Sequence, residues 1–507
     1  DGMVLLKNEG LLPLKKNIKK LAVIGPNAKE AQIIGGGSAS LRPHYQIHPL
    51  EAVKERLGHK TEILYSKGCH THKYLPKINE RLMGNKDGFL VEYFDGNKFD
   101  ENLILEERLN GSKFWVFEGF AKDVISQEDR PNISVRFSCE YMPDISGSHE
   151  FEIFGIGQCR LLIDGNELID NWTSTDPGEA FFTFGSASKK GIVHFEKGET
   201  YKIEVQYHFE GSFPAVYIGC QAPDAVDIFQ EAIETASSAD EVLLIVGTNS
   251  DWETEGNDRA DFNLPANQNK LIEAILEANQ NTVIVINTGS PVHMPWEKKA
   301  NAIVQTWFAG QEFGNALVDI LSGQVNPSGK LPTTFPAKIE DTPAYKIYPG
   351  NDLQMNYDEK LLVGYRWYER NSIKPLFCFG HGLSYTKFNY QNLDIATGND
   401  FAVSCKFEVQ NLGDISGFET AQCYVGFSEP LSQEPCKTLQ GFVKEEIGAN
   451  ELKKLEIKLG PRNFSYWSVD TNSWQIRRGT YKIFIGSSAE NILLEADINL
   501  EQALEVL

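Results

Sequence analysis

The chain has 507 residues, of which 41% are hydrophobic, 23% charged and 11% aromatic, and its formal net charge at pH 7 is -22. This composition is ordinary for folded proteins and excludes a disordered chain. The length exceeds what a single core usually supports, so we expect roughly three domains. The negative charge is spread along the chain and repels phosphate backbones and anionic lipids, so neither nucleic acid nor a membrane is an expected partner.

The sequence leaves the cellular compartment open. It has no run of about eighteen or more apolar residues, and its first stretch, DGMVLLKNEGLLPLKK, lacks the basic start and the long apolar stretch of a signal peptide. The eight cysteines include no CxxC pair, so we expect most of them to be buried thiols and expect neither a zinc site nor a disulfide framework. No metal or cofactor is expected.

Strand and helix patterns alternate at both ends of a long β-rich stretch. The run LAVIG at residues 21–25 predicts a buried strand, residues 49–57 a helix, and TEILYSKG another strand. From residue 89 to about residue 222, short alternating runs between glycine and asparagine turns predict an all-β domain. Helix and strand patterns then return, with the strands EVLLIVG, TVIVINTG and AIVQTW.

This order predicts an α/β domain into which a β domain is inserted. Strands flanked by helices are typical of a largely parallel sheet with helices on both faces. The simplest account joins residues 1–87 and 223–340 into one sheet and inserts residues 88–222 in a surface loop. A connector rich in proline and tyrosine, residues 341–389, precedes residues 390–507, whose strand spacing predicts a β-sandwich.

The segment SDWETEGNDR, residues 250–259, places four acidic side chains directly after an apolar strand. Loops at the carboxyl ends of parallel strands form the ligand crevice of such sheets, although acidic residues there also serve simply to solvate a turn or cap a helix. Trp252 among the carboxylates and the tight turn that Gly256 permits favour a functional loop. An ion pair expected between Asp258 and Arg259 would hold the loop rigid.

A rigid carboxylate beside an aromatic ring suits sugar chemistry, because the ring stacks on a pyranose while the carboxyl protonates the leaving oxygen. The spacing does not choose between Glu253 and Glu255, which should face opposite ways in an extended loop. The run GGGSAS, residues 35–40, lacks a GxGxxG pattern and a Walker lysine, so it predicts a flexible or close-packed loop and not a phosphate site.

Several stretches resemble glycoside hydrolase family 3, the β-glucosidase family, in the part that follows its N-terminal barrel. They are DGMVLLKNEGLLPL, LAVIGPNA, GGGSAS, WETEGNDR, NTVIVINTGSPVHMPW, WFAGQEFGNALVDILSGQVNPSGKLPTTFP, VGYRWYE and FGHGLSYTKF. The inserted block looks like a PA14 domain and the last part like a fibronectin type III-like domain. The resemblance therefore implies a multidomain α/β and all-β protein, in which an α/β sandwich carries a PA14-like insertion and precedes a fibronectin type III-like β-sandwich.

The resemblance also implies a retaining hydrolase that removes terminal β-D-glucosyl residues from short oligosaccharides or glucosides with two carboxylates. Glu255 matches the family's acid/base, so burial or a nearby carboxylate should raise its pKa toward neutrality. Glu253, Asp258 and Arg259 are expected to support the loop. Four further residues, two of them in an inserted domain that overhangs the site, are candidates for substrate contacts: Trp252, Arg42, Arg160 and Trp172.

The family's nucleophile is an aspartate in an SDW-like motif on a (β/α)8 barrel, and we expect no such barrel in this sequence. The SDW at residues 250–252 lies in the acid/base loop and is interpreted as a coincidence. We therefore expect a barrel supplied elsewhere as a partner and little hydrolysis by this chain alone. β-Xylosidase and α-arabinofuranosidase activities stay open, as do a carbohydrate-binding or adhesion module and an interaction scaffold.

Overall fold

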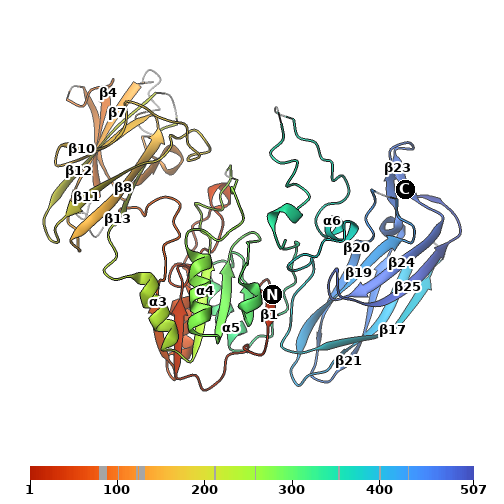
Figure 1. The fold of residues 1–507 in the computed structure, drawn as a ribbon. Coiled ribbons are helices and arrows are strands. Elements are labelled where there is room, and N and C mark those ends of the chain that lie inside the picture. Colours follow the sequence, from red (N-terminus) through yellow and green to blue (C-terminus); the bar gives the residue numbers. More distant parts are fainter. Residues whose placement is uncertain are drawn as a thin grey trace.

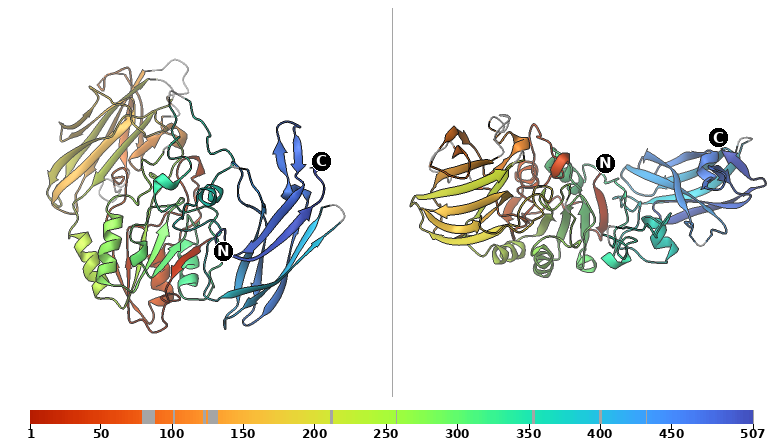
Figure 2. Two further views of the ribbon diagram at one scale, coloured as in Figure 1. Left: turned by 45° about the vertical axis from the view of Figure 1, so that its right-hand side comes forward. Right: turned by 90° about the horizontal axis from the view of Figure 1, so that it is seen from above.

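The computed structural model describes residues 1–78, 88–100, 102–121, 124, 132–210, 213–256, 258–351, 354–398, 401–431 and 433–506. These residues form a mixed α/β part with an all-β part on either side of it (Figure 1). Seen from above, the parts lie in a row with the α/β part in the middle (Figure 2). The expected boundary of the insertion at residue 87 lies outside the described residues.

The middle part is built on a six-stranded sheet. Its strand order is β1 (Val4–Asn8), β16 (Ala302–Gln305), β15 (Thr282–Asn287), β14 (Glu241–Gly247), β2 (Lys20–Ile24) and β3 (Glu62–Ser66). Neighbouring strands are parallel except for β1 and β16, which are antiparallel. The largely parallel sheet expected from the sequence is thus confirmed, with an antiparallel strand at one edge.

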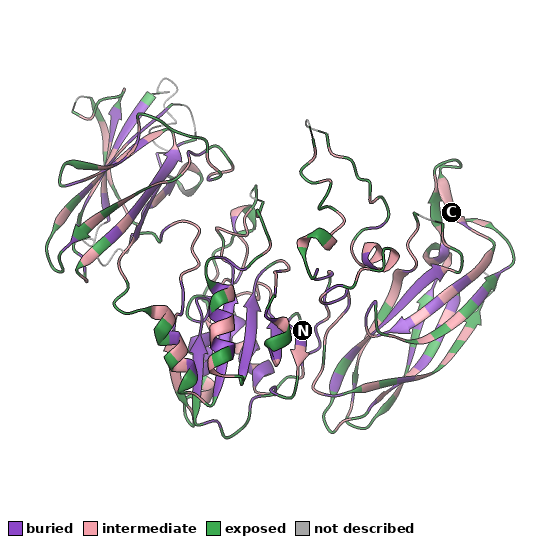
Figure 3. Ribbon diagram, viewed as in Figure 1, coloured by how far each residue is buried: buried purple, intermediate pink, exposed green. Residues whose placement is uncertain are grey.

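Helices cover both faces of this sheet. They are α1 (Pro49–Leu57), α3 (Ile228–Ser237), α4 (Gln268–Ala278) and α5 (Phe313–Leu321). The pair α1 and α5 packs over one hydrophobic core, and the pair α3 and α4 packs over the other. Because both faces are covered, a central strand must be largely apolar, and β14 is buried at every position, Glu241 at its start included. Figure 3 shows these buried strands in purple beside partly exposed helices.

The β domain after residue 88 consists of two antiparallel sheets around one core. The larger sheet has the order β10 (Asn166–Asn171), β9 (Gln158–Ile163), β12 (Tyr201–Glu210), β7 (Asn132–Tyr141), β4 (Phe89–Asp95) and β5 (Leu103–Leu109). The smaller sheet has the order β11 (Lys189–Phe195), β8 (Gly147–Ile156), β13 (Ala215–Gln221) and β6 (Lys113–Trp115). Aromatic rings fill the core, where Phe114 and Phe137 stack with centroids 4.6 Å apart.

The C-terminal part is also all-β, and two of its sheets share one core. One has the order β17 (Phe388–Thr397), β18 (Val403–Asn411) and β21 (Leu452–Leu459), and the other β20 (Thr438–Ile447), β19 (Gly417–Phe427), β24 (Gly479–Gly486) and β25 (Ile492–Leu500). A small sheet adds β22 (Tyr466–Ser468), β23 (Ser473–Ile476) and β26 (Leu504–Val506). The connector before this part contains α6 (Tyr365–Arg370).

The cysteines are free thiols, and all are buried except Cys436, which is partly exposed. The expectation that most of the cysteines are buried thiols is confirmed. Across the described ranges, no helix is long and apolar enough to cross a membrane. Among the described side chains, no group of three or more His, Cys, Asp and Glu residues is placed to hold a metal ion.

Candidate functional site

The acidic loop begins at the carboxyl end of β14, and Gln268 at the start of α4 fixes this point. The Gln268 side chain is fully buried; its amide nitrogen donates to Gly247 O at 2.7 Å, and its oxygen accepts from Gly247 N–H at 2.8 Å. The side-chain amide thereby satisfies backbone groups for which the end of a strand needs partners. The loop therefore leaves the sheet from an anchored position.

Buried asparagines link the neighbouring loops at this edge of the sheet by hydrogen bonds. Asn27, after β2, donates to Thr248 O at 3.0 Å. Asn287, at the end of β15, donates to Gln32 O at 2.8 Å and to Trp307 O at 2.7 Å. Because buried amides are costly to leave unpaired, these bonds tie the loops after β2, β14, β15 and β16 together. The acidic loop thus lies on a rigid platform.

The two candidate glutamates have different partners. Glu253 accepts a hydrogen bond from Thr248 Oγ1 at 2.6 Å and another from Gly289 N–H at 3.0 Å, so it ties the acidic loop to the turn after β15. Glu255 is exposed and accepts from Ser38 N–H at 3.1 Å. The loop is coiled into turns and not extended as expected, yet the two carboxylates still bond to different segments.

The glycine-rich run packs directly against the acidic loop. Gly36 N–H donates to Glu253 O at 2.9 Å, and a Cβ on Gly36 would lie 2.3 Å from Ser250 O. Gly37 has φ +66°, and a Cβ there would lie 2.8 Å from the Cβ of Glu255. Only glycine accommodates this approach without strain. Of the two expectations for this run, the close-packed loop is confirmed.

The carboxyls of the loop differ in their protonation behaviour. Hydrogen bonds from the side chain and backbone of Ser38 hold the pKa of Glu255 below its ordinary value. The expectation of a pKa raised toward neutrality is wrong for this structure, because the carboxylate is exposed and hydrogen bonds favour its charged form. Burial instead raises the pKa of Asp251, although nearby lysines, chiefly Lys113, oppose the rise.

A cavity of about 770 Å³ lies between the acidic loop and the inserted β domain. The acidic and glycine-rich loops form one wall, with Asp251 and Glu255 among its residues. The opposite wall carries aromatic side chains of the β domain: Trp115, Phe154, Phe181, Phe182 and Tyr217. Phe182 reaches the acidic loop itself, because a Cβ on Gly256 would lie 3.3 Å from its ring.

A strained turn carries two of these rings. Phe181, Phe182 and Thr183 have φ values of 52°, 59° and 67°, and the ring centroid of Trp115 lies 5.6 Å from each of the two phenylalanine rings. Each such backbone conformation costs roughly 1–3 kcal/mol and persists only where the surroundings hold it. Sequence reasoning missed Trp115, Phe181 and Phe182. For Phe181 and Phe182 the sequence signal was only a pair of phenylalanines in a loop, which does not indicate what they face.

Trp252 is anchored by the segment that follows β3. Its Nε1 donates to Thr71 O at 2.6 Å, and the Lys73 ammonium lies 5.8 Å from its ring centroid. Trp252 and Glu255 both line a second cavity, of about 470 Å³. The acid/base candidate therefore borders both cavities.

The ion pair expected between Asp258 and Arg259 is corrected by the structure. Asp258 accepts a hydrogen bond from the Tyr348 hydroxyl of the connector. Arg259 donates to Ser290 Oγ at 3.2 Å and to Asn263 O at 2.8 Å. Neighbours in a turned chain point to different sides, so these two residues fasten the loop to two separate segments.

The remaining candidates lie elsewhere. Arg160 and Trp172 meet on the larger sheet of the β domain, with the guanidinium 5.2 Å from the ring centroid, and Arg160 Nε donates to Gln206 at 2.8 Å. Arg42 is an exposed residue after the glycine-rich run. Within the described residues, other side chains line the cavities beside Glu255. The structure does not bring Arg42, Arg160 or Trp172 to the acid/base candidate.

Comparison with known proteins agrees with this architecture. The profile of the "Glycosyl hydrolase family 3 C-terminal domain" matches residues 3–385, and that of the "Fibronectin type III-like domain" matches residues 419–489. A beta-glucosidase of Rhizobium radiobacter is 34% identical over 514 residues, which cover 99% of this chain and 61% of that protein. Beta-glucosidase B of Emericella nidulans is 36% identical over 536 residues, with 99% and 62% covered.

A solved structure is similar over the same extent. The crystal structure of beta-glucosidase from Kluyveromyces marxianus in complex with glucose has a TM-score of 0.90 and 32% identity, covering 99% of this chain and 62% of that one. The chain thus spans about 61–62% of the length of these relatives. Because the profile match covers more than half of its residues, the chain belongs to the family of glycosyl hydrolase family 3 C-terminal domains.

Proposed function

We propose that the chain forms part of a β-glucosidase-like retaining glycoside hydrolase, which removes terminal β-D-glucosyl residues from short oligosaccharides or glucosides. One observation carries the proposal: an exposed carboxylate, Glu255, stands on an anchored loop at the carboxyl edge of the sheet and faces an aromatic wall across a cavity. The relatives' names, and the glucose in the complex of one of them, support this substrate class.

In this proposal Glu255 is the acid/base. Its carboxyl protonates the glycosidic oxygen in the first step, and its carboxylate then takes a proton from the attacking water. The ionised, hydrogen-bonded state found here suits the second role. The first role requires a higher pKa, which desolvation provides when substrate and further protein surface cover the carboxyl.

A retaining mechanism also needs a nucleophilic carboxylate about 5 Å from the acid/base. We assign it to a (β/α)8 barrel that acts as the partner of this chain. The part of the relatives that this chain does not match leaves room for such a barrel. Trp252, which lines the second cavity together with Glu255, would then meet the substrate there.

We further propose that residues 88–222 are a PA14-like insertion in an α/β sandwich domain made of residues 1–87 and 223–340. Residues 341–389 then connect this domain to a fibronectin type III-like domain, residues 390–507. The proposal is supported by the middle sheet, which combines strands from both flanks of the insertion. In the proposed insertion, Phe182 overhangs the acidic loop and limits the length of the sugar chain that fits.

The test measures hydrolysis of p-nitrophenyl β-glucoside by the chain alone and by the chain mixed with a separately produced family barrel. We expect activity in the mixture, and Glu255→Gln should reduce it by roughly 10²- to 10⁴-fold, the usual contribution of acid–base catalysis. Glu456→Gln is a matched control, because Glu456 is also exposed and accepts a hydrogen bond from a serine, Ser404 Oγ, at 2.6 Å.

The outcomes separate the alternatives. Full activity of the Glu255→Gln mixture contradicts the acid/base assignment. An associated but inactive mixture that still binds glucose favours the carbohydrate-binding module over the hydrolase. Faster hydrolysis of the β-xyloside or the α-arabinofuranoside than of the β-glucoside would keep the mechanism and replace the substrate.

A further inference from the structure

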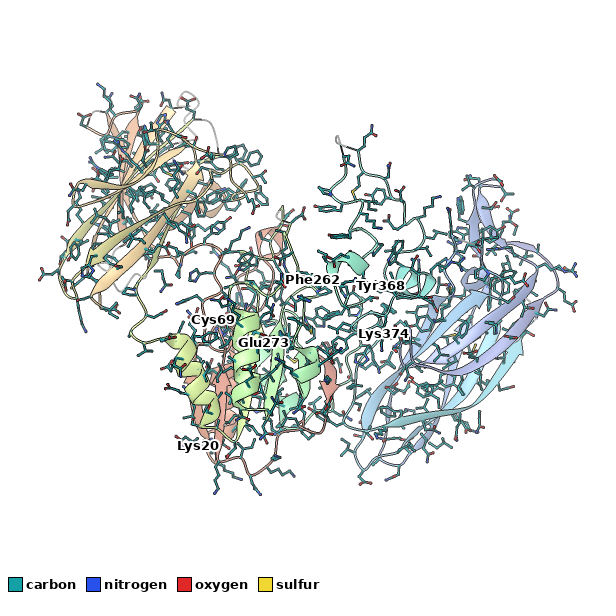
Figure 4. All side chains as sticks on the ribbon, in the orientation of Figure 1. Lys20, Cys69, Phe262, Glu273, Tyr368 and Lys374 are labelled. Carbon is teal, nitrogen blue, oxygen red and sulfur yellow. The ribbon has the colours of Figure 1, made fainter. Side chains whose placement is uncertain are left out.

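A cavity of about 380 Å³ lies where the connector meets the C-terminal β-sandwich. It shares no lining residue with the two cavities that border Glu255. Its walls are Thr334, α6, the segment at residues 372–378, Lys437 just before β20, and the turn between β24 and β25 with the first residue of β25. Figure 4 labels two of its residues, Tyr368 and Lys374, between the middle part and the C-terminal sandwich.

The walls are fastened to each other, so the cavity is preformed. The Tyr365 ring stacks on Phe379 with centroids 4.8 Å apart, and its hydroxyl accepts a hydrogen bond from Leu439 N–H at 2.8 Å. On the far side, Cys378 Sγ donates to Ser488 Oγ at 3.4 Å. These contacts hold α6 and the connector against the sandwich. Small-molecule sites are typically preformed cavities of this size, largely apolar with a few placed polar groups.

Buried polar atoms in this lining lack protein partners. Thr334 is 8% exposed, and its Oγ1 is buried without a hydrogen-bond partner among the described residues. Glu369 contacts the Lys437 ammonium through one oxygen, whereas its other oxygen, Oε2, is buried and likewise lacks a partner in the described part of the chain. Leaving such groups unpaired costs free energy, and a polar ligand that hydrogen-bonds to them would remove this cost.

The charged groups around the cavity balance each other and favour a ligand without net charge. Two carboxylates, Glu369 and Glu490, and two ammonium groups, Lys374 and Lys437, line it. The carboxylates disfavour a phosphate or another anion, and the buried Lys437, which is 7% exposed, disfavours a metal cation. Hydrogen-bond donors and acceptors together with tyrosine rings in one lining match a ring that carries several hydroxyl groups.

We propose that this cavity is a non-catalytic binding site for a neutral polyol of monosaccharide size. The Thr334 hydroxyl and Glu369 Oε2 bind its hydroxyl groups, and Tyr365 and Tyr368 flank its C–H face. A ligand here bridges the connector and the β-sandwich, so it stabilises their docking. The site does not depend on Glu255 or on the proposed hydrolysis.

D-Glucose is the probe, and the isoleucine methyl groups of the full chain, observed by NMR, are the reporters. Ile373 and Ile492 both line the cavity. Their methyl signals should shift in a saturable way as glucose is added. Thr334→Val keeps the side-chain shape and removes the hydroxyl, so it should weaken this binding roughly five- to tenfold, the effect of one lost hydrogen bond.

Thr342→Val is the matched control, because the Thr342 hydroxyl donates to Ile339 O at 2.8 Å and lies outside this lining. It should leave glucose binding unchanged. Ala489→Leu, which fills the cavity from a residue that is 6% exposed, should abolish the shifts and provides a second test if Thr334→Val does not fold. Absence of saturable shifts at Ile373 and Ile492, or equal affinity in the folded Thr334→Val variant, would overturn the proposal.

Discussion

The contact between the glycine-rich run and the acidic loop is most directly tested at Gly37. In Gly37→Ala, the new methyl group would lie 2.8 Å from Glu255 Cβ and 3.0 Å from Glu255 N, at a residue whose φ is +66°. The backbone conformation costs a non-glycine residue about 1–2 kcal/mol. Forcing a methyl group into a packed contact adds about 1–3 kcal/mol. We therefore expect a local destabilisation of about 2–5 kcal/mol.

Gly10→Ala separates these two contributions. Gly10 has φ +84°, but a Cβ there would have no atom within 4 Å. It should therefore cost only the backbone contribution, about 1–2 kcal/mol. The difference between the variants, about 1–3 kcal/mol, corresponds to roughly a 5- to 150-fold difference in local opening.

Hydrogen exchange followed by mass spectrometry measures this opening. The buried amide of Gly36, which donates to Glu253 O at 2.9 Å, reports on residues 34–40, and peptides around Gly10 report on the control. Each variant is compared with the unmodified chain. If exchange at residues 34–40 in Gly37→Ala rises no more than exchange around Gly10 in Gly10→Ala, the contact with Glu255 does not hold the loop.

Other predictions concern ionisation and thiol reactivity. Ser38→Ala should raise the pKa of Glu255 toward its ordinary value, measured by carboxyl NMR titration, because it removes a hydrogen bond to the charged form. That bond stabilises the fold at pH values above the unfolded-state pKa of Glu255, and this contribution is lost as pH falls through the folded-state pKa. Ser38→Ala should therefore weaken the dependence of stability on pH in this acidic range, and an unchanged dependence would refute the prediction. The folded-state pKa of Asp251 is raised, so stability falls as pH rises from the unfolded-state pKa of this residue to its folded-state pKa. Asp251→Asn removes the titrating group, so the urea midpoint should change less with pH across this window. Maleimide at pH 8 should label Cys436 first, because the other thiols are buried and burial raises the pKa of Cys69 to about 12; prior labelling of Cys69 would contradict this.

Local patterns along the chain were sufficient for most secondary structure. The apolar run of β14 and the helix at residues 49–57 follow from periodicity, because burial on both faces of a strand or on one face of a helix imposes a short-range pattern. Burial of most thiols was likewise predicted, and close packing of the glycine-rich run was one of two expectations. The secondary structure and the burial of thiols depend on residue types and on neighbours along the sequence, whereas the partner of the glycine-rich run is the distant acidic loop.

The neighbourhood of Glu255 was decided by tertiary structure. Its lowered pKa comes from Ser38, which is 217 residues away in sequence, and from an exposure that no local pattern records. The expected pairing of Asp258 with Arg259 failed because adjacent side chains point to different sides of a turned chain. Phe182 meets the acidic loop only because the inserted domain docks over it.

The sequence by itself therefore determined the elements, the family resemblance and the loop that carries the candidate carboxylate. Tertiary structure alone decided which aromatic rings face that loop and how its carboxyls ionise. The physical reason is that periodicity and turn propensity act over a few residues. Desolvation, hydrogen bonding and ring contacts depend instead on atoms that folding brings together from distant parts of the chain.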